Sequence, residues 1–217
     1  MNGVEQGPHA FIVPLRDKKR HLPFAGITIG DCGKKEGYEG TDNGFIIFDN
    51  IRIPKANFLN RLSDINSEGQ FTSPFKSASA RFALSLSGLS VGRLIIQMSM
   101  TQNLSTACKI AIRFAFLRKQ FGGDPKTNVE QPLIDYEMHR YRLFPLVAQA
   151  FSIRNIGNYM RETWFSYSKK IFKPGNFKMA ELHSLLTCQK AYSTWAAFNG
   201  IHECRLACGG LGYSWYS

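Results

Sequence analysis

Residues 77–119 read SASARFALSLSGLSVGRLIIQMSMTQNLSTACKIAIRFAFLRK, and this stretch decides the fold class. Its apolar residues recur at the three- and four-residue spacing of a helix, and no proline interrupts them. One straight helix of this length would be exceptional, so the glycines predict a bend or break near Ser87–Gly88 or at Gly92. The stretch therefore predicts a long helical segment that is divided near its start.

Two further helical segments follow along the chain. The second is expected over about residues 133–166, with a kink or local break at Pro145. A basic loop over residues 169–175 leads to the third, which is expected over about residues 177–207. Three long helices with short connections predict an antiparallel helical bundle.

The N-terminal region has the sequence pattern of strands rather than helices. Short β-branched and aromatic runs at residues 9–15, 26–30 and 44–49 alternate with Gly, Asp and Asn clusters, which is typical of strands joined by turns. Three or four strands with free edges make a poor independent domain, so they are interpreted as part of a larger sheet. The predicted fold is α+β and mainly α, with a partial antiparallel β-domain over residues 1–60 and the helical bundle over residues 61–217.

The composition is that of a globular, basic protein. A hydrophobic content of 44% with 13% aromatic residues excludes a disordered chain. The 27 Lys and Arg against 16 acidic residues give a net charge of +11, which favours phosphate-bearing partners. These charges are scattered, without the continuous stripe or module that nucleic-acid binding uses. We therefore predict no nucleic-acid partner, and a basic helical module for DNA or RNA is kept as a weaker alternative.

Other site chemistry has little support. The 5 cysteines contain no CxxC pair and are interpreted as buried reduced thiols. The 5 histidines lack metal-site spacing and are expected to be packing or surface residues, so no metal is predicted. No Gly-x-Ser-x-Gly motif points to a hydrolase. No apolar run has the length of a membrane span, and neither terminus carries a recognisable targeting signal.

Two short segments could contact a ligand. After the first long helix, residues 118–122 (RKQFG) combine a cation suited to phosphate, an amide, a flat aromatic face and a glycine. The same residues would also suit an ordinary helix C-terminus with favourable cations and a glycine cap. Residues 208–213 (CGGLGY) place three glycines in four positions, which lets another group approach the backbone closely. The alternative is a helix C-cap followed by a glycine turn.

Several segments along the chain occur in the order found in one known family. They are GPHAFIVP (7–14), GYEGTDNGF (37–45), DNIRIP (49–54), RKQFG (118–122) and CRLACGGLGY (204–213). Together they resemble the peroxisomal acyl-CoA oxidases of the acyl-CoA dehydrogenase superfamily, over nearly the whole chain. The resemblance implies an FAD enzyme of fatty acid β-oxidation in the peroxisome. It implies dehydrogenation of a fatty acyl-CoA to trans-2-enoyl-CoA, with oxygen reduced to hydrogen peroxide.

The resemblance also implies cofactor-binding residues. In the family, the Arg-x-Gln-Phe-Gly motif reaches across a dimer interface to the FAD of the neighbouring subunit. The matching residues here are Arg118, Gln120, Phe121 and Gly122. The family's glycine corner lies near the adenosine half of the flavin, and its matches are Gly209, Gly210 and Gly212. Leu211 stands where many members carry histidine, so any role that needs that polar group is in doubt.

No catalytic residue is assigned within the chain. The family's proton acceptor is a glutamate expected beyond Ser217, and Gly92 occupies the position that some related dehydrogenases fill with glutamate. Glu39 is followed by the Asp-Asn-Gly segment 42–44 and is interpreted as a turn residue. Glu203 is expected on a packed helix and is not favoured as a base. The chain alone is therefore expected to be inactive.

Two functional hypotheses follow from the resemblance. In the first, the chain is a segment of an FAD-dependent acyl-CoA oxidase that acts on fatty acyl-CoA as a homodimer. In the second, it is a non-catalytic, oxidase-like subunit that pairs with a full-length oxidase and donates Arg118 and Phe121 to the partner's flavin.

Overall fold

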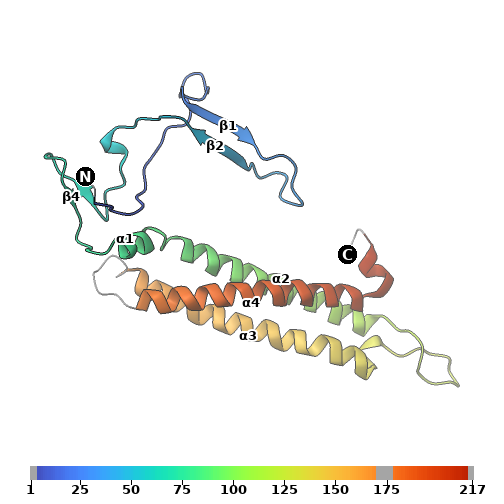
Figure 1. Ribbon diagram of the computed structural model, residues 1–217. Helices are drawn as coiled ribbons and strands as arrows, with labels where there is room; N and C mark the ends of the chain where they lie inside the picture. Colours follow the sequence, from blue (N-terminus) through green and yellow to red (C-terminus); the bar gives the residue numbers. More distant parts are fainter. Residues whose placement is uncertain (1–3, 170–177, 215–217) are drawn as a thin grey trace. The chain divides into compact units, whose positions relative to one another are not determined.

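The structure is a computed structural model that describes residues 4–169 and 178–214. It divides into two compact units, Met1–Ser85 and Leu86–Ser217. In Figure 1 the first unit runs from blue to green and the second from green to red. The domain boundary near residue 60 stays a prediction.

The first unit contains two small antiparallel sheets. Strand β1, Ile27–Asp31, pairs with β2, Gly44–Phe48, in a register that runs from Ile27 opposite Phe48 to Asp31 opposite Gly44. Strand β3, Asp64–Ile65, pairs with β4, Phe71–Thr72. The strands predicted at residues 26–30 and 44–49 are therefore confirmed. The apolar side chains of β2 remain exposed.

The strand predicted over residues 9–15 is wrong. This segment forms a single bridge, from Phe11 to Phe58, next to the short 3-10 helix η1, Lys55–Asn57. Its pairing is limited to hydrogen bonds such as Ile12 N to Asn57 O at 2.8 Å. Pro8 precedes the segment and Pro14 lies within it, and neither can donate a backbone hydrogen bond to a longer ladder.

A buried arginine holds the first unit together. Arg81 lies on helix α1, Ala78–Ser85, and is 5% exposed. Its guanidinium donates to the carbonyl oxygens of Phe75 at 2.7 Å and Gln6 at 2.8 Å, and it lies over the ring of Phe71. Buried charge is tolerated here because several acceptors and an aromatic face replace water.

The second unit is a bundle of three long helices. They are α2, Leu89–Leu117, α3, Glu137–Ser168, and α4, Lys178–Ala207. Figure 1 shows that α2 and α4 run in the same direction and α3 runs against both. The bundle and the mainly helical fold class are confirmed. Short 3-10 helices precede α3 (η2, Leu133–Asp135) and follow α4 (η3, Gly209–Tyr213).

The predicted helix boundaries are only partly correct. A break was predicted either near Ser87–Gly88 or at Gly92. The structure has it at the first position, because α2 begins directly after Gly88, whereas Gly92 lies inside α2. Helix α3 continues through Pro145, so the predicted local break is wrong, while the kink given as its alternative stays a prediction. The carbonyl of Tyr141, which loses its backbone donor, belongs to an exposed residue, so water can replace that donor. Most of the predicted loop at 169–175 lies outside the described residues.

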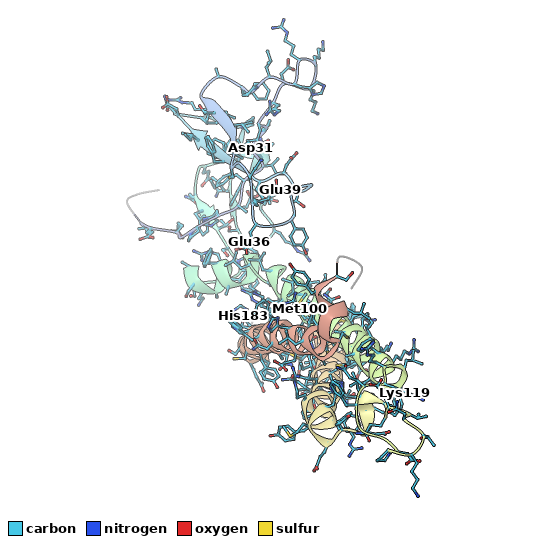
Figure 2. The ribbon with its side chains drawn as sticks, turned by 90° about the vertical axis from the view of Figure 1, so that its right-hand side faces the viewer. Asp31, Glu36, Glu39, Met100, Lys119 and His183 are labelled. Atoms are coloured by element: carbon cyan, nitrogen blue, oxygen red, sulfur yellow. The ribbon has the colours of Figure 1, made fainter. Side chains whose placement is uncertain are left out.

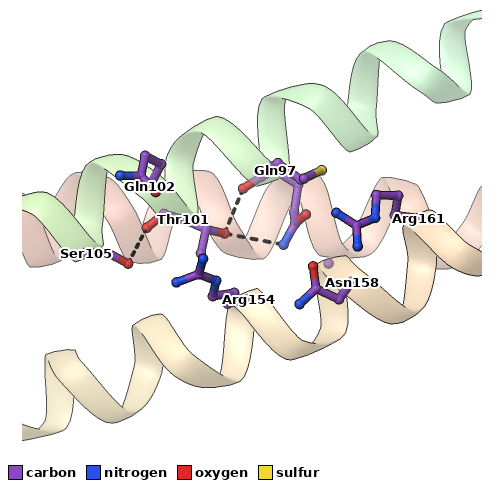
Figure 3. Close-up of a pocket in the computed structure, with 9 residues that line it drawn as sticks. Gln97, Thr101, Gln102, Ser105, Arg154, Asn158 and Arg161 are labelled. Carbon is purple, nitrogen blue, oxygen red and sulfur yellow. Dashed lines mark hydrogen bonds between the residues drawn. The ribbon is translucent and has the colours of Figure 1, made fainter.

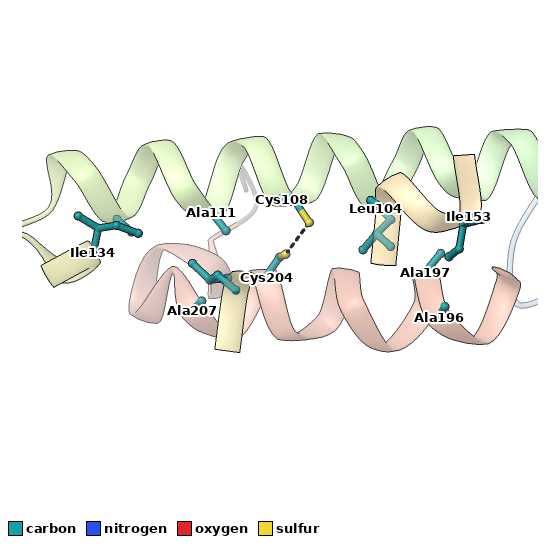
Figure 4. Close-up of a cluster of buried hydrophobic side chains, with 12 residues drawn as sticks. Leu104, Cys108, Ala111, Ile134, Ile153, Ala196, Ala197, Cys204 and Ala207 are labelled. Carbon is teal, nitrogen blue, oxygen red and sulfur yellow. Dashed lines mark hydrogen bonds between the residues drawn. The ribbon is translucent and has the colours of Figure 1, made fainter. Parts of the chain in front are cut away.

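Small residues let the helices approach one another closely. The core cluster in Figure 4 includes Leu104 and Ala111 from α2 and Ala197 from α4, all at most 1% exposed. Gly200 on α4 faces Leu104, and a Cβ there would lie 2.6 Å from Leu104 Cδ1. The buried thiols of Cys108 and Cys204 lie 3.9 Å apart and are not bonded as a disulfide. The burial of Leu104 alone is worth about 1.5–3 kcal/mol.

None of the described helices is by itself long and apolar enough to cross a membrane. Helices α1 and α2 meet the criteria of length and composition only when taken together as a bent pair.

Candidate functional site

A cavity of about 470 Å³ lies at one end of the helical bundle. It is bounded by the last turn of α2, the first turns of α3, and the junction between α4 and η3. Its lining residues are Phe114, Arg118, Gln120, Leu133, His139, Arg142, Leu206, Ala207, Cys208, Gly209, Gly210 and Leu211. Four of the predicted cofactor-binding residues therefore meet in one cavity, although they come from segments about ninety positions apart in the sequence.

The segment after α2 is held extended by antiparallel pairing. The N–H of Arg118 closes the last turn of α2 by donating to Phe114 O at 2.8 Å, whereas its carbonyl joins the pairing by accepting from Leu133 N at 2.8 Å. Gln120 N donates to Gln131 O at 3.1 Å, and the hydroxyl of Tyr136 donates to Gln120 O at 2.7 Å. These bonds satisfy the backbone of the segment, so the side chains of Arg118 and Gln120 remain available to the cavity.

The predicted residues Phe121 and Gly122 do not line the cavity. Both have positive φ, 51° and 55°, and Phe121 is 72% exposed. The N–H of Phe121 donates to Glu130 Oε1 at 3.0 Å. A Cβ on Gly122 would lie 2.7 Å from the side chain of Gln131. The structure therefore places Phe121 on the surface and gives Gly122 a local packing role. Lys119 follows Arg118 and precedes Gln120 in the sequence, and Figure 2 shows it at the end of the bundle.

The glycine corner combines a helix cap with an open face. Gly209 has φ of 60° directly after Cys208, as expected for a glycine that ends a helix. A Cβ on Gly209 or Gly210 would meet nothing within 4 Å, so the backbone there is open to a ligand. Gly212 is different, because it is buried and its Cβ would collide with the carbonyl of Arg205. Gly209 and Gly210 can therefore end the helix and also leave the backbone open to a ligand, so the two interpretations of this segment are compatible.

The cavity is basic. Arg118 makes no ion pair within residues 4–169 and 178–214. Burial, followed by the charge of Arg142, lowers the pKa of His139 below its usual value, so its imidazole is neutral at pH 7. His139 Nε2 is buried without a hydrogen-bond partner within the same ranges. Burial also raises the pKa of Cys208, which therefore stays a neutral thiol. Such a surface suits an anion that accepts several hydrogen bonds.

Two of these residues were not predicted. His139 was expected to be a packing or surface residue, and Arg142 was not singled out. They lie three positions apart on α3, so one helix face presents both to the cavity. The three-residue spacing of His139 and Arg142 near the start of α3 is visible in the sequence. It does not by itself indicate a site, because the sequence does not show which face of α3 meets α2 and α4.

The carboxylates considered as possible bases have structural partners. Glu203 accepts from Arg142 Nη2 at 2.9 Å and from its Nε at 3.2 Å. Glu39, exposed in the first unit (Figure 2), accepts from the N–H of Lys35 at 2.7 Å. Thr41 N donates to Tyr38 O at 2.9 Å, which closes a turn around Glu39. Glu39 is thus a turn residue, as interpreted, and Glu203 orients Arg142. Within the described ranges no cluster of three His, Cys, Asp or Glu residues could hold a metal ion.

The pair between Arg142 and Glu203 is expected to contribute little stability. Both side chains are about 40% exposed, so water and salt screen their attraction. We expect Glu203→Gln to lower the free energy of unfolding by only about 0.2–1 kcal/mol, measured by urea denaturation. A loss well above this range would contradict the assignment of Glu203 as a surface partner of Arg142.

Comparison with known proteins agrees with this architecture. Residues 86–217 match the family model described as acyl-CoA oxidase, C-alpha1 domain. Peroxisomal acyl-coenzyme A oxidase 1 of Rattus norvegicus is 39% identical over 209 residues, which cover 96% of this chain and 31% of that protein. Peroxisomal acyl-coenzyme A oxidase 3 of Homo sapiens is 39% identical over 212 residues, covering 95% of this chain and 30% of that protein. The chain thus spans less than a third of the length of these curated relatives.

Solved structures give the same result. Acyl-CoA oxidase-2 of Caenorhabditis elegans, described as bound with FAD, ascaroside-CoA and ATP, has a TM-score of 0.83 and 33% identity. The match covers 97% of this chain and 31% of that one. Acyl-CoA oxidase 1 of Arabidopsis thaliana has a TM-score of 0.80 and 34% identity over 95% of this chain and 31% of that one. Because the family model covers the whole helical unit, the chain belongs to the acyl-CoA oxidase family.

Proposed function

We propose that this chain is part of an FAD-dependent acyl-CoA oxidase and supplies the flavin-binding surface of its first C-terminal helical domain. The reaction is the α,β-dehydrogenation of a fatty acyl-CoA to trans-2-enoyl-CoA, with oxygen reduced to hydrogen peroxide, in peroxisomal β-oxidation. One observation carries the proposal: Arg118, Gln120, Gly209 and Gly210 line a single cavity in a member of this family.

The residues present fit the diphosphate and adenosine side of FAD. Arg118 can hold a phosphate bidentately, and Gln120 can both donate and accept hydrogen bonds. The unpartnered Nε2 of His139 provides a further polar contact, and Gly209 and Gly210 leave room beside the backbone. The cavity volume of about 470 Å³ lies in the range of small-molecule sites. When bound, FAD supplies the acceptor for the hydride from the acyl β carbon.

The residues of the cavity can hold and orient FAD, but they do not remove a proton from the substrate. None of the described residues that line it is a carboxylate, and we assign its histidine, His139, to a contact with the diphosphate. A general base must lie within hydrogen-bonding reach of the proton that it abstracts. We therefore propose that the base for the acyl α-proton lies outside this cavity and that the chain alone does not turn over substrate.

The exposure of Phe121 favours action across a subunit interface. This side chain is 72% exposed beside the cavity, on a loop whose backbone is fixed by hydrogen bonds to Gln131 and Glu130. A fixed, exposed aromatic residue is suited to contact a partner subunit or its cofactor. The partner is either a second copy of this chain or a full-length oxidase. In the second case the chain is a non-catalytic, oxidase-like subunit.

Flavin binding by the purified chain tests the proposal. FAD is titrated into the chain, alone and with a full-length acyl-CoA oxidase, and bound flavin is followed by fluorescence quenching. Oxidation of palmitoyl-CoA is followed by release of hydrogen peroxide. We expect flavin binding and no peroxide from the chain alone. A folded chain that binds no FAD under either condition would refute the proposed function.

Flavin affinity is expected to increase at acidic pH because of His139. The pKa of this histidine lies below its usual value in the free protein, and a bound diphosphate raises it by favouring the charged form. Binding therefore takes up a proton between the two pKa values, and affinity rises as the pH falls through that window. FAD titrations at pH 5.5 and 7.5 should differ by roughly a few-fold. His139→Asn should remove the difference, and a pH effect that persists in this variant would contradict the assignment.

A further inference from the structure

A second groove runs between α2 and α3, away from the cavity at the helix ends. It consists of two adjoining cavities of about 330 Å³ and about 140 Å³, which share Gln102, Ser105 and Arg154. Neither contains any residue of the cavity assigned to flavin. The groove is therefore distinct from the cavity assigned to flavin.

The larger cavity has an apolar floor and a basic rim. Its apolar lining residues are Cys108, Ile112, Val147, Ala150 and Phe151. Its cationic lining residues are Lys109, Arg113 and Arg154. A cavity of this size with mostly apolar walls and a few polar groups is typical of a small-molecule site.

The smaller cavity is polar, and Figure 3 shows its residues. Gln97 projects from α2 toward α3, and the residue is 2% exposed. Its Nε2 donates to Ile153 O at 2.9 Å and to Thr101 Oγ1 at 3.4 Å. Its Oε1 is buried without a partner among the residues that the structure describes. A Cβ on Gly157 would lie 2.5 Å from this oxygen, so glycine is what makes room for the amide.

Polar side chains line the smaller cavity on both helices. Thr101 and Ser105 belong to α2, and Asn158 belongs to α3. Gln97 Oε1 itself is closed off from solvent beside Gly157, so it does not contact a ligand in the cavity. The polar lining makes the smaller cavity suited to the polar group of a ligand.

The charges of the groove identify the polar group as an anion. The smaller cavity adds Arg161 to Arg154, and Asn158 lies between them in Figure 3. Among the described lining residues of both cavities there is no Asp or Glu. None of the four lining cations takes part in the ion pairs formed by described residues. Uncompensated guanidinium groups favour a carboxylate or phosphate, which accepts paired hydrogen bonds.

We propose that this groove binds a fatty acid such as laurate as its carboxylate. The hydrocarbon chain occupies the larger cavity, and the carboxylate lies between Arg154 and Arg161 in the smaller one, beside the amide of Asn158. Apolar walls remove the chain from water, while the arginines select an anionic headgroup over a neutral one. The inference does not rest on the flavin site and concerns a free acid rather than the coenzyme A ester.

Displacement of a fluorescent fatty acid from the 217-residue chain tests the proposal. Laurate, 1-dodecanol and butyrate are compared as competitors. We expect laurate to compete about tenfold better than dodecanol, and butyrate to fail because it lacks the long chain. The double variant Arg154→Gln/Arg161→Gln should lose about tenfold in laurate affinity without a change for dodecanol.

Matched variants keep the test decisive. Lys119→Gln/Lys126→Gln removes the same charge from exposed positions outside both cavities and should leave laurate affinity unchanged. Val147→Phe fills the apolar cavity and should weaken laurate and dodecanol alike. Because Arg154 is exposed and Arg161 only half-buried, the arginine variant keeps its fold even if Val147→Phe does not. Equal laurate affinity in the arginine and lysine variants, or equal affinity for laurate and dodecanol, would overturn the proposal.

Discussion

Replacing Gly212 with alanine is expected to lower the free energy of unfolding by about 3 kcal/mol. Gly212 is buried, and an added Cβ would overlap the carbonyl of Arg205 in the last turn of α4. The obstacle is backbone rather than a flexible side chain, so α4 and η3 must separate to relieve it. For a chain of this length, such a loss lowers the midpoint of thermal unfolding by about 6–12 °C. Circular dichroism at increasing temperature measures it.

Gly210→Ala is the matched control, two residues away in the same 3-10 helix. Nothing lies within 4 Å of its added Cβ, and Gly210 does not have positive φ. Its unfolding free energy should change by less than about 0.5 kcal/mol. Because Gly210 lines the cavity, its methyl group should instead weaken FAD binding. Equal stability losses in the two variants would contradict the separate roles assigned to these glycines.

Replacing Arg118 with alanine is expected to weaken FAD binding about 10- to 100-fold. A hydrogen bond to a charged group is worth about 1.5–3 kcal/mol, which corresponds to this range of affinity. Arg118 is exposed, and no described residue forms an ion pair with it, so its removal leaves no buried charge behind. The fold should therefore be retained, and the loss should appear in a flavin titration.

Lys119→Ala is the control for charge at the same place in the chain. Lys119 is adjacent in sequence and carries the same charge, but it does not line the cavity. We expect a change of less than about threefold at physiological ionic strength, because screening limits its long-range effect. Similar losses for both variants would show that net charge, rather than contact by Arg118, governs binding.

The sequence was sufficient to predict that the three long helices form. The positions at which helices break or continue depend also on exposure to solvent and on packing. The break before α2 was visible because glycine at position 88 weakens a helix. Pro145 does not break α3, since the carbonyl that it leaves free belongs to the exposed residue Tyr141. The segment 9–15 has β-forming residues, but its partner is a short turn around η1 rather than a strand. Strand formation depends on a partner that local sequence does not specify.

Only part of the candidate site could be predicted. The residue types at 118–122 and 208–213 indicated two possible ligand contacts, but no spacing rule joins segments so far apart. They meet because α2 and α4 run in parallel and pack closely, as where Gly200 leaves room for the side chain of Leu104. The contributions of His139 and Arg142 depend on the rotation of α3 about its axis, which the weakly periodic sequence of α3 leaves undetermined.

The parallel course of α2 and α4 also has an electrostatic consequence for the cavity. Both helices end there, and each C-terminus carries the equivalent of about half a negative charge, while the N-terminus of α3 offers about half a positive one. The helix dipoles alone would therefore repel a diphosphate, unlike the sites where phosphates bind helix N-termini. Arg118 reverses the sign of this field, because the charge of Arg142 is offset by its partner Glu203. Anion binding at this end of the bundle is thus controlled by side chains, and a single substitution can switch it off without altering the backbone.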